Sequence, residues 1–197
     1  MNIEVKSNDR VFVCGRTGSG KSYLVKNLLI PRMTNYVIYD YKSEIEIPGA
    51  VVFTRINDFK KNPNQHAIIY QTQSGTDKEF DALCKQVFYR GNNTLILDET
   101  AYHCTQSKIM RHHGLIMQLG RSKGVGIINC TQRPRGIHNN IISQCEHFFT
   151  FDLTQGTDRD KLADFCGEQL EIRAKEYHFW YYHVSHEEAT FCAPVKV

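Results

Sequence analysis

Eight consecutive residues near the start of the chain match the phosphate-binding pattern G-x-x-x-x-G-K-[ST] at every defined position. These residues are Gly15, Arg16, Thr17, Gly18, Ser19, Gly20, Lys21 and Ser22. Apolar residues 11–14 predict a buried strand before this loop, and residues 23–29 predict the helix that follows it. The backbone N–H groups of such a loop and the positive end of the helix dipole point toward a phosphate. We therefore predict a nucleoside triphosphate site, in which Lys21 reaches the β- and γ-phosphates and Ser22 ligates Mg²⁺.

A pair of carboxylates, Asp98 and Glu99, follows a strand-like run at residues 94–97. In a parallel sheet, Asp98 would lie at the carboxyl end of its strand beside the phosphate loop, where it can hold Mg²⁺ through water. Glu99 comes next and is placed to polarise a water for in-line attack on the γ-phosphate. The simpler interpretation is a strand end capped by exposed acids. We favour it less because the phosphate loop is also present.

A polar amide, Gln132, follows the apolar strand pattern at residues 125–130. At the tip of a strand beside the carboxylate strand, an amide can sense the γ-phosphate or hold the attacking water. The alternative is that Gln132 only caps its strand. We favour the catalytic role because of the motifs that accompany it.

Strand-like apolar runs alternate with helix-like segments, which predicts an α/β fold with a mostly parallel central sheet flanked by helices. No repeat, low-complexity tract or linker divides the sequence, so residues 1–197 are expected to form a single domain. Its core spans about residues 10–167, and a C-terminal β-hairpin is expected over about residues 175–194. Further strands are expected at residues 36–39, 51–53, 67–70 and 147–151, and helices at residues 77–89, 107–119, 137–143 and 157–167.

The net charge of +3 hides an asymmetry along the sequence. No aspartate or glutamate occurs between Glu99 and Glu146, although this segment carries six lysine and arginine residues. Single charges of this kind are usually solvated, but together they favour a surface that faces a polyanion, such as nucleic-acid phosphates or a neighbour's nucleotide. The basic residues are Lys108, Arg111, Arg121, Lys123, Arg133 and Arg135.

Composition narrows the class of protein further. Charged residues make up 23% of the chain and apolar residues 41%, which is typical of globular domains. No apolar run is long enough to cross a bilayer, and no signal peptide is recognisable, so we expect the chain to stay in a cytoplasm. The seven cysteines include no C-x-x-C pair and are expected to be reduced thiols. His183, His186 and Cys192, like His112 and His113, lack complete ligand spacing, so hydrogen-bonded histidines are favoured over a metal site.

Four segments, taken in order, resemble those of the FtsK–HerA superfamily of DNA-pumping ATPases. They are residues 15–22, the acidic–lysine–acidic stretch 40–44, residues 95–99, and residues 120–134 with their G-R-x-x-G and T-Q-R-P elements. The last segment is the most specific, because phosphate loops occur in many other families. The resemblance covers about residues 11–167. Within the superfamily, a bare domain of this size is most similar to the genome-packaging ATPases of tailless, internal-membrane icosahedral viruses.

The resemblance implies a RecA-like P-loop NTPase core that forms a ring of identical subunits, expected to be a hexamer. It also implies an ATPase that uses ATP and Mg²⁺ to move double-stranded DNA of any sequence into a preformed capsid. Arg121 matches the motif position of an arginine that stabilises transition-state charge on the neighbouring subunit's nucleotide, with Arg133, Arg135 and Arg111 as open alternatives. The implied partners are the capsid vertex or internal membrane proteins, and the implied location is the host cytoplasm or the packaging vertex of the virion.

Other interpretations stay open at this point. One is a plasmid- or conjugation-type ATPase, or a filamentous-phage assembly ATPase, of the same superfamily; membrane segments would favour it. Another is a nucleotide-dependent switch that moves no DNA, against which the Asp98–Glu99 pair argues. In the packaging interpretation, some of the basic and histidine side chains at residues 108–113 are candidates to line a central pore and contact the DNA backbone. The aromatic residues of the hairpin are expected to serve packing, and a docking role for the capsid is less favoured.

Overall fold

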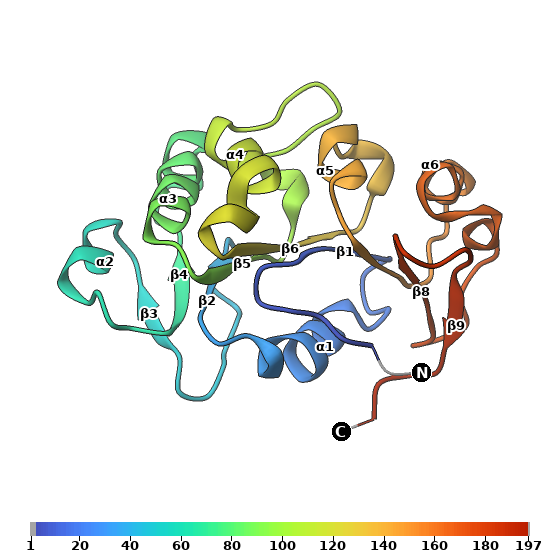
Figure 1. Cartoon of the computed structure of the whole chain (residues 1–197), viewed down its shortest axis with the longest axis horizontal. Coiled ribbons are helices and arrows are strands. Elements are labelled where there is room, and N and C mark those ends of the chain that lie inside the picture. Colours follow the sequence, from blue (N-terminus) through green and yellow to red (C-terminus); the bar gives the residue numbers. More distant parts are fainter. Residues whose placement is uncertain (1–2, 197) are drawn as a thin grey trace.

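The computed structural model describes residues 3–196 and shows a nine-stranded sheet that runs through the molecule (Figure 1). Its strand order is β3-β4-β2-β5-β6-β1-β7-β8-β9. All pairings among β1 to β7 are parallel, whereas β7–β8 and β8–β9 are antiparallel. The predicted α/β class with a mostly parallel sheet is therefore confirmed. The strands are β1 (Arg10–Cys14), β2 (Tyr36–Asp40), β3 (Val51–Phe53), β4 (Ala67–Gln71), β5 (Asn93–Leu97), β6 (Val125–Thr131), β7 (His147–Thr150), β8 (Phe179–His183) and β9 (Thr190–Cys192).

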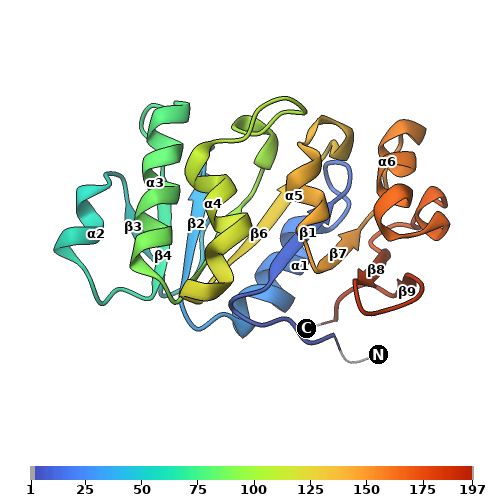
Figure 2. The ribbon, with the colours of Figure 1, turned by 45° about the horizontal axis from the view of Figure 1, so that its top comes forward.

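Helices cover both faces of the sheet. Helices α3, α4 and α5 lie on one face and α1 on the other, while α2 and α6 lie toward its two ends (Figures 1 and 2). The helices are α1 (Lys21–Leu24), α2 (Asn57–Lys61), α3 (Asp77–Arg90), α4 (Arg111–Leu119), α5 (Asn139–Ser143) and α6 (Gly156–Cys166). Helix α1 continues through a π-helical segment (Val25–Leu29) and a 3-10 turn (Ile30–Arg32). Other 3-10 turns are Thr100–Tyr102, Gly120–Lys123, Pro134–Gly136 and Glu168–Glu171. Between residues 3 and 196, no helix combines the length and apolar character needed to cross a membrane.

The central strands are buried on both faces because helices cover each side. Every residue of β5 and β6 is buried, as expected for parallel strands inside such a fold. Successive side chains of β1 alternate between the two apolar layers: Phe12 packs toward the α3–α4 side and Val13 toward the α1 side. The sheet is therefore held by a separate core on each face.

The order of the parallel strands brings the predicted motifs together. Strand β6 pairs with both β1 and β5, so a single strand separates the phosphate-loop strand from the carboxylate strand. The loop after β1, the acids after β5 and the polar residues after β6 all leave the carboxyl ends of these strands. In open parallel sheets, ligands bind at this edge.

The helix expected at residues 107–119 is shorter than predicted. The pattern favoured residues 107–119, but α4 begins at Arg111. Thr105 and Lys108 form an isolated bridge, with Thr105 N 2.9 Å from Lys108 O. The backbone N–H and C=O groups of Thr105 and Lys108 bond to each other in this turn, so these residues cannot join the helix.

The predicted C-terminal hairpin is present as β8 and β9, and it extends the sheet. Strand β8 pairs with β7 in an antiparallel register that sets Thr150 opposite Trp180. Its buried members, Phe179 and Tyr181, pack into the core on the α1 side. The aromatic residues of β8 therefore serve packing, and the chain that follows β9 returns toward α1.

Candidate functional site

The phosphate loop requires glycine for its shape. Gly18 and Gly20 have φ angles of +74° and +111°, a region that favours glycine. At Gly15, a Cβ atom would lie only 2.6 Å from the Cβ of Phe151, so no larger residue fits. The loop thus curls between β1 and α1 in the way that the sequence pattern predicted.

Two side chains of the loop are placed to receive an anion. The Lys21 ammonium donates to the backbone oxygens of Gly15 at 2.7 Å and Arg16 at 3.2 Å, so it lies across the loop. The Ser19 hydroxyl is buried and has no hydrogen-bond partner among the described residues. A buried hydroxyl without a partner is costly, and a phosphate oxygen above the loop would satisfy it. The arrangement fits a triphosphate.

An aspartate that the sequence analysis did not select anchors the loop from the side. The Asp152 backbone oxygen accepts from Arg16 N at 2.8 Å, and its carboxylate accepts from Arg16 Nε at 2.9 Å. The same carboxylate accepts two bonds of 2.8 Å from Arg173. These bonds, those from Arg173 first, lower the pKa of Asp152 to about 2. An acid two residues after strand β7 was the available signal, but its partners lie far away in the sequence.

The predicted magnesium ligands lie close to each other. Ser22 and Asp98 both line a hollow of about 270 Å³ beside α1. Burial raises the pKa of Asp98, and the nearby carboxylates of Asp40 and Glu44 raise it further. A divalent cation would relieve this clustering of negative charge, and carboxylate and hydroxyl oxygens are the donors that Mg²⁺ accepts. The residues present therefore fit the ion.

The Asp40 carboxylate shapes the loop after β2. It is 1% exposed and accepts hydrogen bonds from the backbone N–H groups of Glu44 at 3.2 Å and Ile45 at 3.0 Å. The loop carries Lys42 to the same hollow as Asp98, and this cation acts to lower the Asp98 pKa. The acidic–lysine–acidic stretch thus sets the charge around Asp98.

Glu99 and Gln132 are joined to each other and to the phosphate loop. The Glu99 carboxylate accepts from the backbone N–H of Ala101 at 3.2 Å and of Gln132 at 3.1 Å. The Gln132 side-chain oxygen accepts from the Thr17 hydroxyl at 2.7 Å. Burial raises the pKa of Glu99, which makes the carboxylate a better proton acceptor. The predicted general base and the predicted amide therefore meet at the loop.

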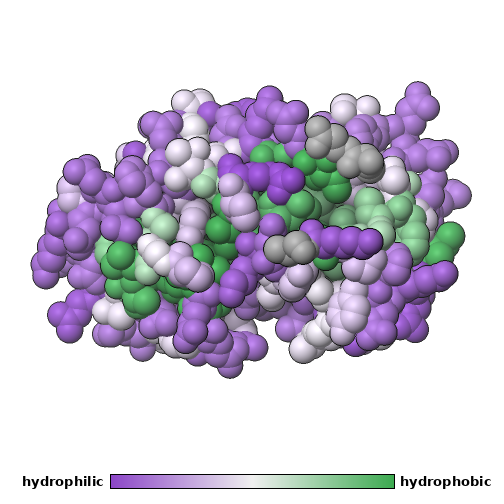
Figure 3. Space-filling view, turned by 90° about the horizontal axis from the view of Figure 1, so that it is seen from below, coloured by the Kyte–Doolittle hydropathy of each residue, from purple (hydrophilic) through white to green (hydrophobic). Residues whose placement is uncertain are grey.

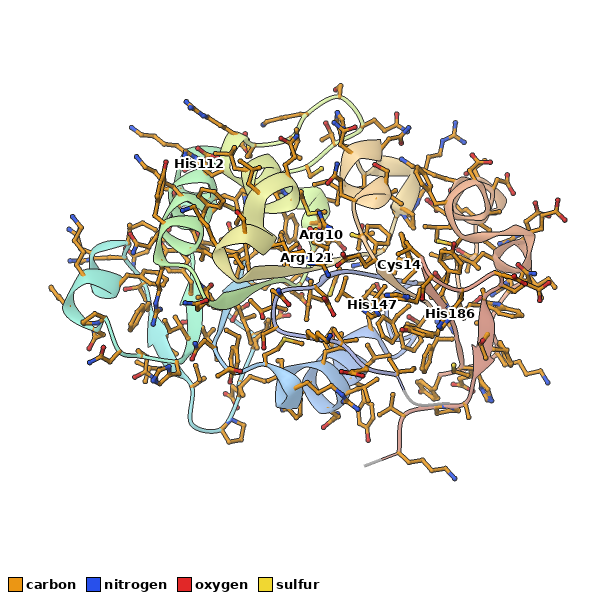
Figure 4. All side chains as sticks on the ribbon, viewed as in Figure 1. Arg10, Cys14, His112, Arg121, His147 and His186 are labelled. Carbon is orange, nitrogen blue, oxygen red and sulfur yellow. The ribbon has the colours of Figure 1, made fainter. Side chains whose placement is uncertain are left out.

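Arg121 lies at the other edge of the sheet. Its guanidinium is 2.8 Å from the Glu146 carboxylate and 3.7 Å from that of Asp9, residues that stand just before β7 and β1. Arg10 binds the same Glu146 oxygen, and Figure 4 shows Arg10 and Arg121 close together. The length of β1, about 15 Å, separates this cluster from the phosphate loop of the same chain.

The alternative arginines have different surroundings. Arg133 is tied within its own chain, with Nε 2.8 Å from Asp158 and Nη2 2.6 Å from Gln155. Asp158 also accepts from the backbone N–H of Arg135 at 2.9 Å. Arg111 and Arg135 are exposed on the surface. Arg133 therefore holds the turn after β6 in place.

The structure corrects one residue of the expected pore-lining group. His113 is fully buried, and its Nε2 lies 3.0 Å from the Asn129 side-chain oxygen. Burial lowers its pKa to about 4, so it is neutral inside the fold. His113 cannot contact DNA because its helix turns this side chain toward β6. His112, labelled in Figure 4, is instead paired with Asp81 at 2.7 Å.

The cysteines are mostly buried, and His183 forms a local hydrogen bond. All seven cysteines are free thiols, and six of them are buried. His183 hydrogen-bonds to Ser185 at 2.7 Å. Among residues 3–196, no group of three or more His, Cys, Asp or Glu side chains is arranged to hold a metal ion.

The glycine-shaped loop between β1 and α1, the acids after β5 and the parallel sheet define the fold of a P-loop nucleoside triphosphatase. A solved structure of the genome packaging NTPase B204 from Sulfolobus turreted icosahedral virus 2, in complex with AMPPCP, matches this chain with a TM-score of 0.83. The two sequences are 23% identical, and the match covers 96% of this chain and 99% of B204.

Two further proteins resemble this chain. Protein P9 of Pseudoalteromonas phage PM2 is 26% identical over 180 residues, which cover 85% of this chain and 83% of P9. The pCW3 conjugation coupling protein TcpA matches with a TM-score of 0.64 and 13% identity, over 96% of this chain and 61% of TcpA. No protein-family model matches the sequence. The likeness to viral packaging ATPases that the motifs predicted is thus confirmed, and it establishes the fold.

Proposed function

We propose that this protein is an ATPase that couples hydrolysis to the movement of double-stranded DNA into a preformed viral capsid. The observation that carries the proposal is the double contact of Gln132, to Thr17 in the phosphate loop and to Glu99 after β5. It joins the phosphate cradle to the carboxylate that hydrolysis needs. The fold likeness to B204, which is described as a genome packaging NTPase, supports the packaging role.

In the proposed reaction each side chain has a defined task. Lys21 and the loop N–H groups hold the β- and γ-phosphates, and Ser22 and Asp98 would hold Mg²⁺, which neutralises charge on the phosphate oxygens. Glu99 takes a proton from the attacking water as that water bonds to the γ-phosphorus and ADP leaves. Gln132 lies beside Glu99 and orients the water. The products are ADP and inorganic phosphate.

The proposed motor is a ring of identical subunits, a hexamer, with a catalytic arginine supplied by the neighbour. Arg121 stands at the sheet edge opposite its own phosphate loop, so within one chain it has no route to the nucleotide. An arginine that acts on the nucleotide of the next subunit is expected to lie away from its own phosphate loop, as Arg121 does. Its side chain is 57% exposed, which leaves it accessible to a second copy.

A basic surface for DNA is proposed where the turn before α4 meets the turn after β6. Gln106 Nε2 lies 2.6 Å from the backbone oxygen of Arg135, so these two segments are adjacent. Lys161 of α6 binds the same oxygen at 3.4 Å. Arg111 and Arg135, on or next to these segments, are exposed, and Lys108, also exposed, is paired with the Asp77 carboxylate. Contacts of this type bind phosphates without reading bases, as DNA of arbitrary sequence requires.

The proposal is tested by steady-state ATP hydrolysis with and without long double-stranded DNA, at several salt concentrations. DNA should stimulate hydrolysis by the intact chain, the stimulation should fall with salt, and Glu99→Gln should abolish turnover. The matched control is Glu187→Gln, an exposed hairpin carboxylate that should leave turnover unchanged.

Other results would favour other functions. Turnover that needs Glu99 but ignores DNA, with or without capsids, would contradict DNA coupling. Stimulation by DNA without any association with capsids would favour a conjugation-type pump, in line with the fold shared with TcpA. Nucleotide binding without turnover would favour a switch. In the packaging case the protein is expected in the host cytoplasm and at the packaging vertex, bound to capsid-vertex or internal membrane proteins.

A further inference from the structure

The end of the chain forms a wall beside the phosphate loop. A hollow of about 530 Å³ opens there, a volume that suits a small ligand. One end is formed by the loop and α1, and the other by aromatic and apolar residues from just after β7, from the segment before β8 and from the chain after β9. The lining residues are Gly18, Gly20, Lys21, Ser22, Tyr23, Phe151, Tyr177, Pro194 and Val195. The hollow is therefore continuous with the proposed triphosphate site.

The aromatic side chains of the hollow are differently placed. Phe151 is buried and its ring would lie 3.0 Å from a Cβ at Gly20, so it closes the site behind the loop. Tyr23 and Tyr177 are each 51% exposed and leave ring surface open to a ligand. Seen from the α1 side, apolar surface is visible among the hydrophilic residues (Figure 3).

The backbone of Tyr177 is unusual. Its φ angle is +57°, a left-handed conformation that a bulky residue rarely adopts. Such strain persists only where the surroundings impose it, and it recurs at ligand sites. The turn holding it is closed by a 3.0 Å bond from His178 N to Lys175 O, just before β8. The hairpin thus fixes both Tyr177 before β8 and Pro194 after β9.

The lining residues suit the flat face of an aromatic ring, and they do not suit recognition of its edge by hydrogen bonds. Beyond the phosphate end, the lining side chains include no carboxylate, amide or guanidinium. Aromatic stacking tolerates every nucleobase because every base presents a π-face, whereas selection between bases needs directed polar partners.

We infer that this hollow binds the nucleobase of the triphosphate by stacking on Tyr177 and Tyr23 against the Pro194–Val195 segment, and that it accepts adenine and guanine alike. The inference rests on the proposed function, because the phosphate loop must first hold the triphosphate. It gives the C-terminal hairpin a task in nucleotide binding.

The test measures dissociation constants of the full chain for ATP, GTP and tripolyphosphate, each with Mg²⁺, by calorimetry. For the intact chain, ATP and GTP should bind within about fivefold of each other, and both more tightly than tripolyphosphate. Tyr177→Ala should raise the dissociation constants for ATP and GTP by about tenfold and leave that for tripolyphosphate unchanged. Tyr89→Ala removes another exposed tyrosine ring, on α3, and should change none of the three constants.

Three results would overturn the inference while leaving the phosphate site intact. They are equal binding of ATP and tripolyphosphate, unchanged ATP binding by Tyr177→Ala, and a preference for ATP over GTP of about 100-fold or more. Tyr177→Gly separates ring from backbone, because glycine adopts the positive φ without strain. It should weaken ATP binding as Tyr177→Ala does. Normal ATP binding by the glycine variant would contradict a role for the ring. If neither ATP nor tripolyphosphate binds the intact chain, the proposed function fails and the inference fails with it.

Discussion

The Gln132 backbone N–H donates to the Glu99 carboxylate at 3.1 Å, across the boundary between β6 and β5. The two strands are in parallel register, with Leu97 opposite Asn129, so the residues that follow each strand emerge side by side. The Gln132 side chain then turns the other way and accepts from Thr17. One residue thereby links a carboxylate that can take a proton to the loop that can hold the phosphate.

Replacing Gln132 by alanine should separate its two contacts. Gln132→Ala keeps the backbone bond to Glu99 but removes the acceptor for Thr17 and the amide beside the attacking water. We expect kcat to fall about 100-fold with KM within a few-fold, because the lost interaction matters most in the transition state. Steady-state ATPase kinetics measure both constants. Gln73→Ala, at an exposed glutamine before α3, is the control, and an unchanged kcat for Gln132→Ala would remove Gln132 from the mechanism.

Glu99→Gln should change stability as well as activity. Burial raises the Glu99 pKa, so the folded protein holds that proton more firmly than the unfolded chain does. The stability that this group contributes is present below its unfolded pKa of about 4.3 and is lost as pH rises through the folded pKa. The glutamine variant has no such loss. Its melting temperature should therefore exceed that of the intact chain at about pH 7.5, and the difference should shrink toward about pH 4.

Calorimetric melting at a series of pH values measures this difference. Glu187→Gln, on the exposed hairpin turn, should show no comparable pH-dependent gain. A Glu99→Gln variant that melts below the intact chain at neutral pH would show that the hydrogen bonds from Ala101 and Gln132 outweigh the cost of burying the charge.

Local patterns in the sequence were sufficient for the parts of the site that are contiguous in the chain. Lys21, Ser22, Asp98 and Glu99 follow strands that were recognisable from apolar runs, so their place at the sheet edge could be predicted. Gln132 was identified because parallel strands end at one edge. Each of these predictions depended on a strand and the few residues after it.

Contacts between distant segments were beyond the reach of such patterns. The role of Asp152 depends on hydrogen bonds from Arg16 and Arg173, which lie far from it, and on opposite sides of it, in the sequence. Tyr177 reaches the phosphate loop only because the hairpin pairs with β7. His113 was misjudged because a histidine in a basic segment is usually exposed, whereas Asn129 provides it with a buried partner.

Asp152→Asn should destabilise the protein in a pH-dependent way. Hydrogen bonds from Arg173 and Arg16 lower the Asp152 pKa to about 2, so its stabilisation is full above the unfolded value near 3.9 and is lost on acidification toward 2. With allowance for the half-exposed arginines, we expect a loss of about 1–2 kcal/mol at neutral pH. Urea denaturation at about pH 7 and about pH 3 measures the change, which should be smaller in acid. Asp164→Asn on the exposed side of α6 is the control, and equal losses for both variants would contradict a stabilising role for the bonds from Arg16 and Arg173 to Asp152.

The proposed catalytic role of Arg121 can be tested by complementation, because an arginine this far from its own phosphate loop could act only on a neighbour's nucleotide. Arg121→Ala should lower hydrolysis by about 10³-fold, and Lys21→Ala should abolish it. In a ring of both variants mixed equally, about a quarter of the interfaces pair an intact Lys21 with a neighbour's intact Arg121, so activity should return to about that fraction. Arg32→Ala, at an exposed arginine after α1, should keep full activity. Mixed rings that assemble normally yet stay inactive would show that Arg121 stabilises Glu146 and Asp9 within its own chain and that another arginine, Arg111 or Arg135, reaches the nucleotide.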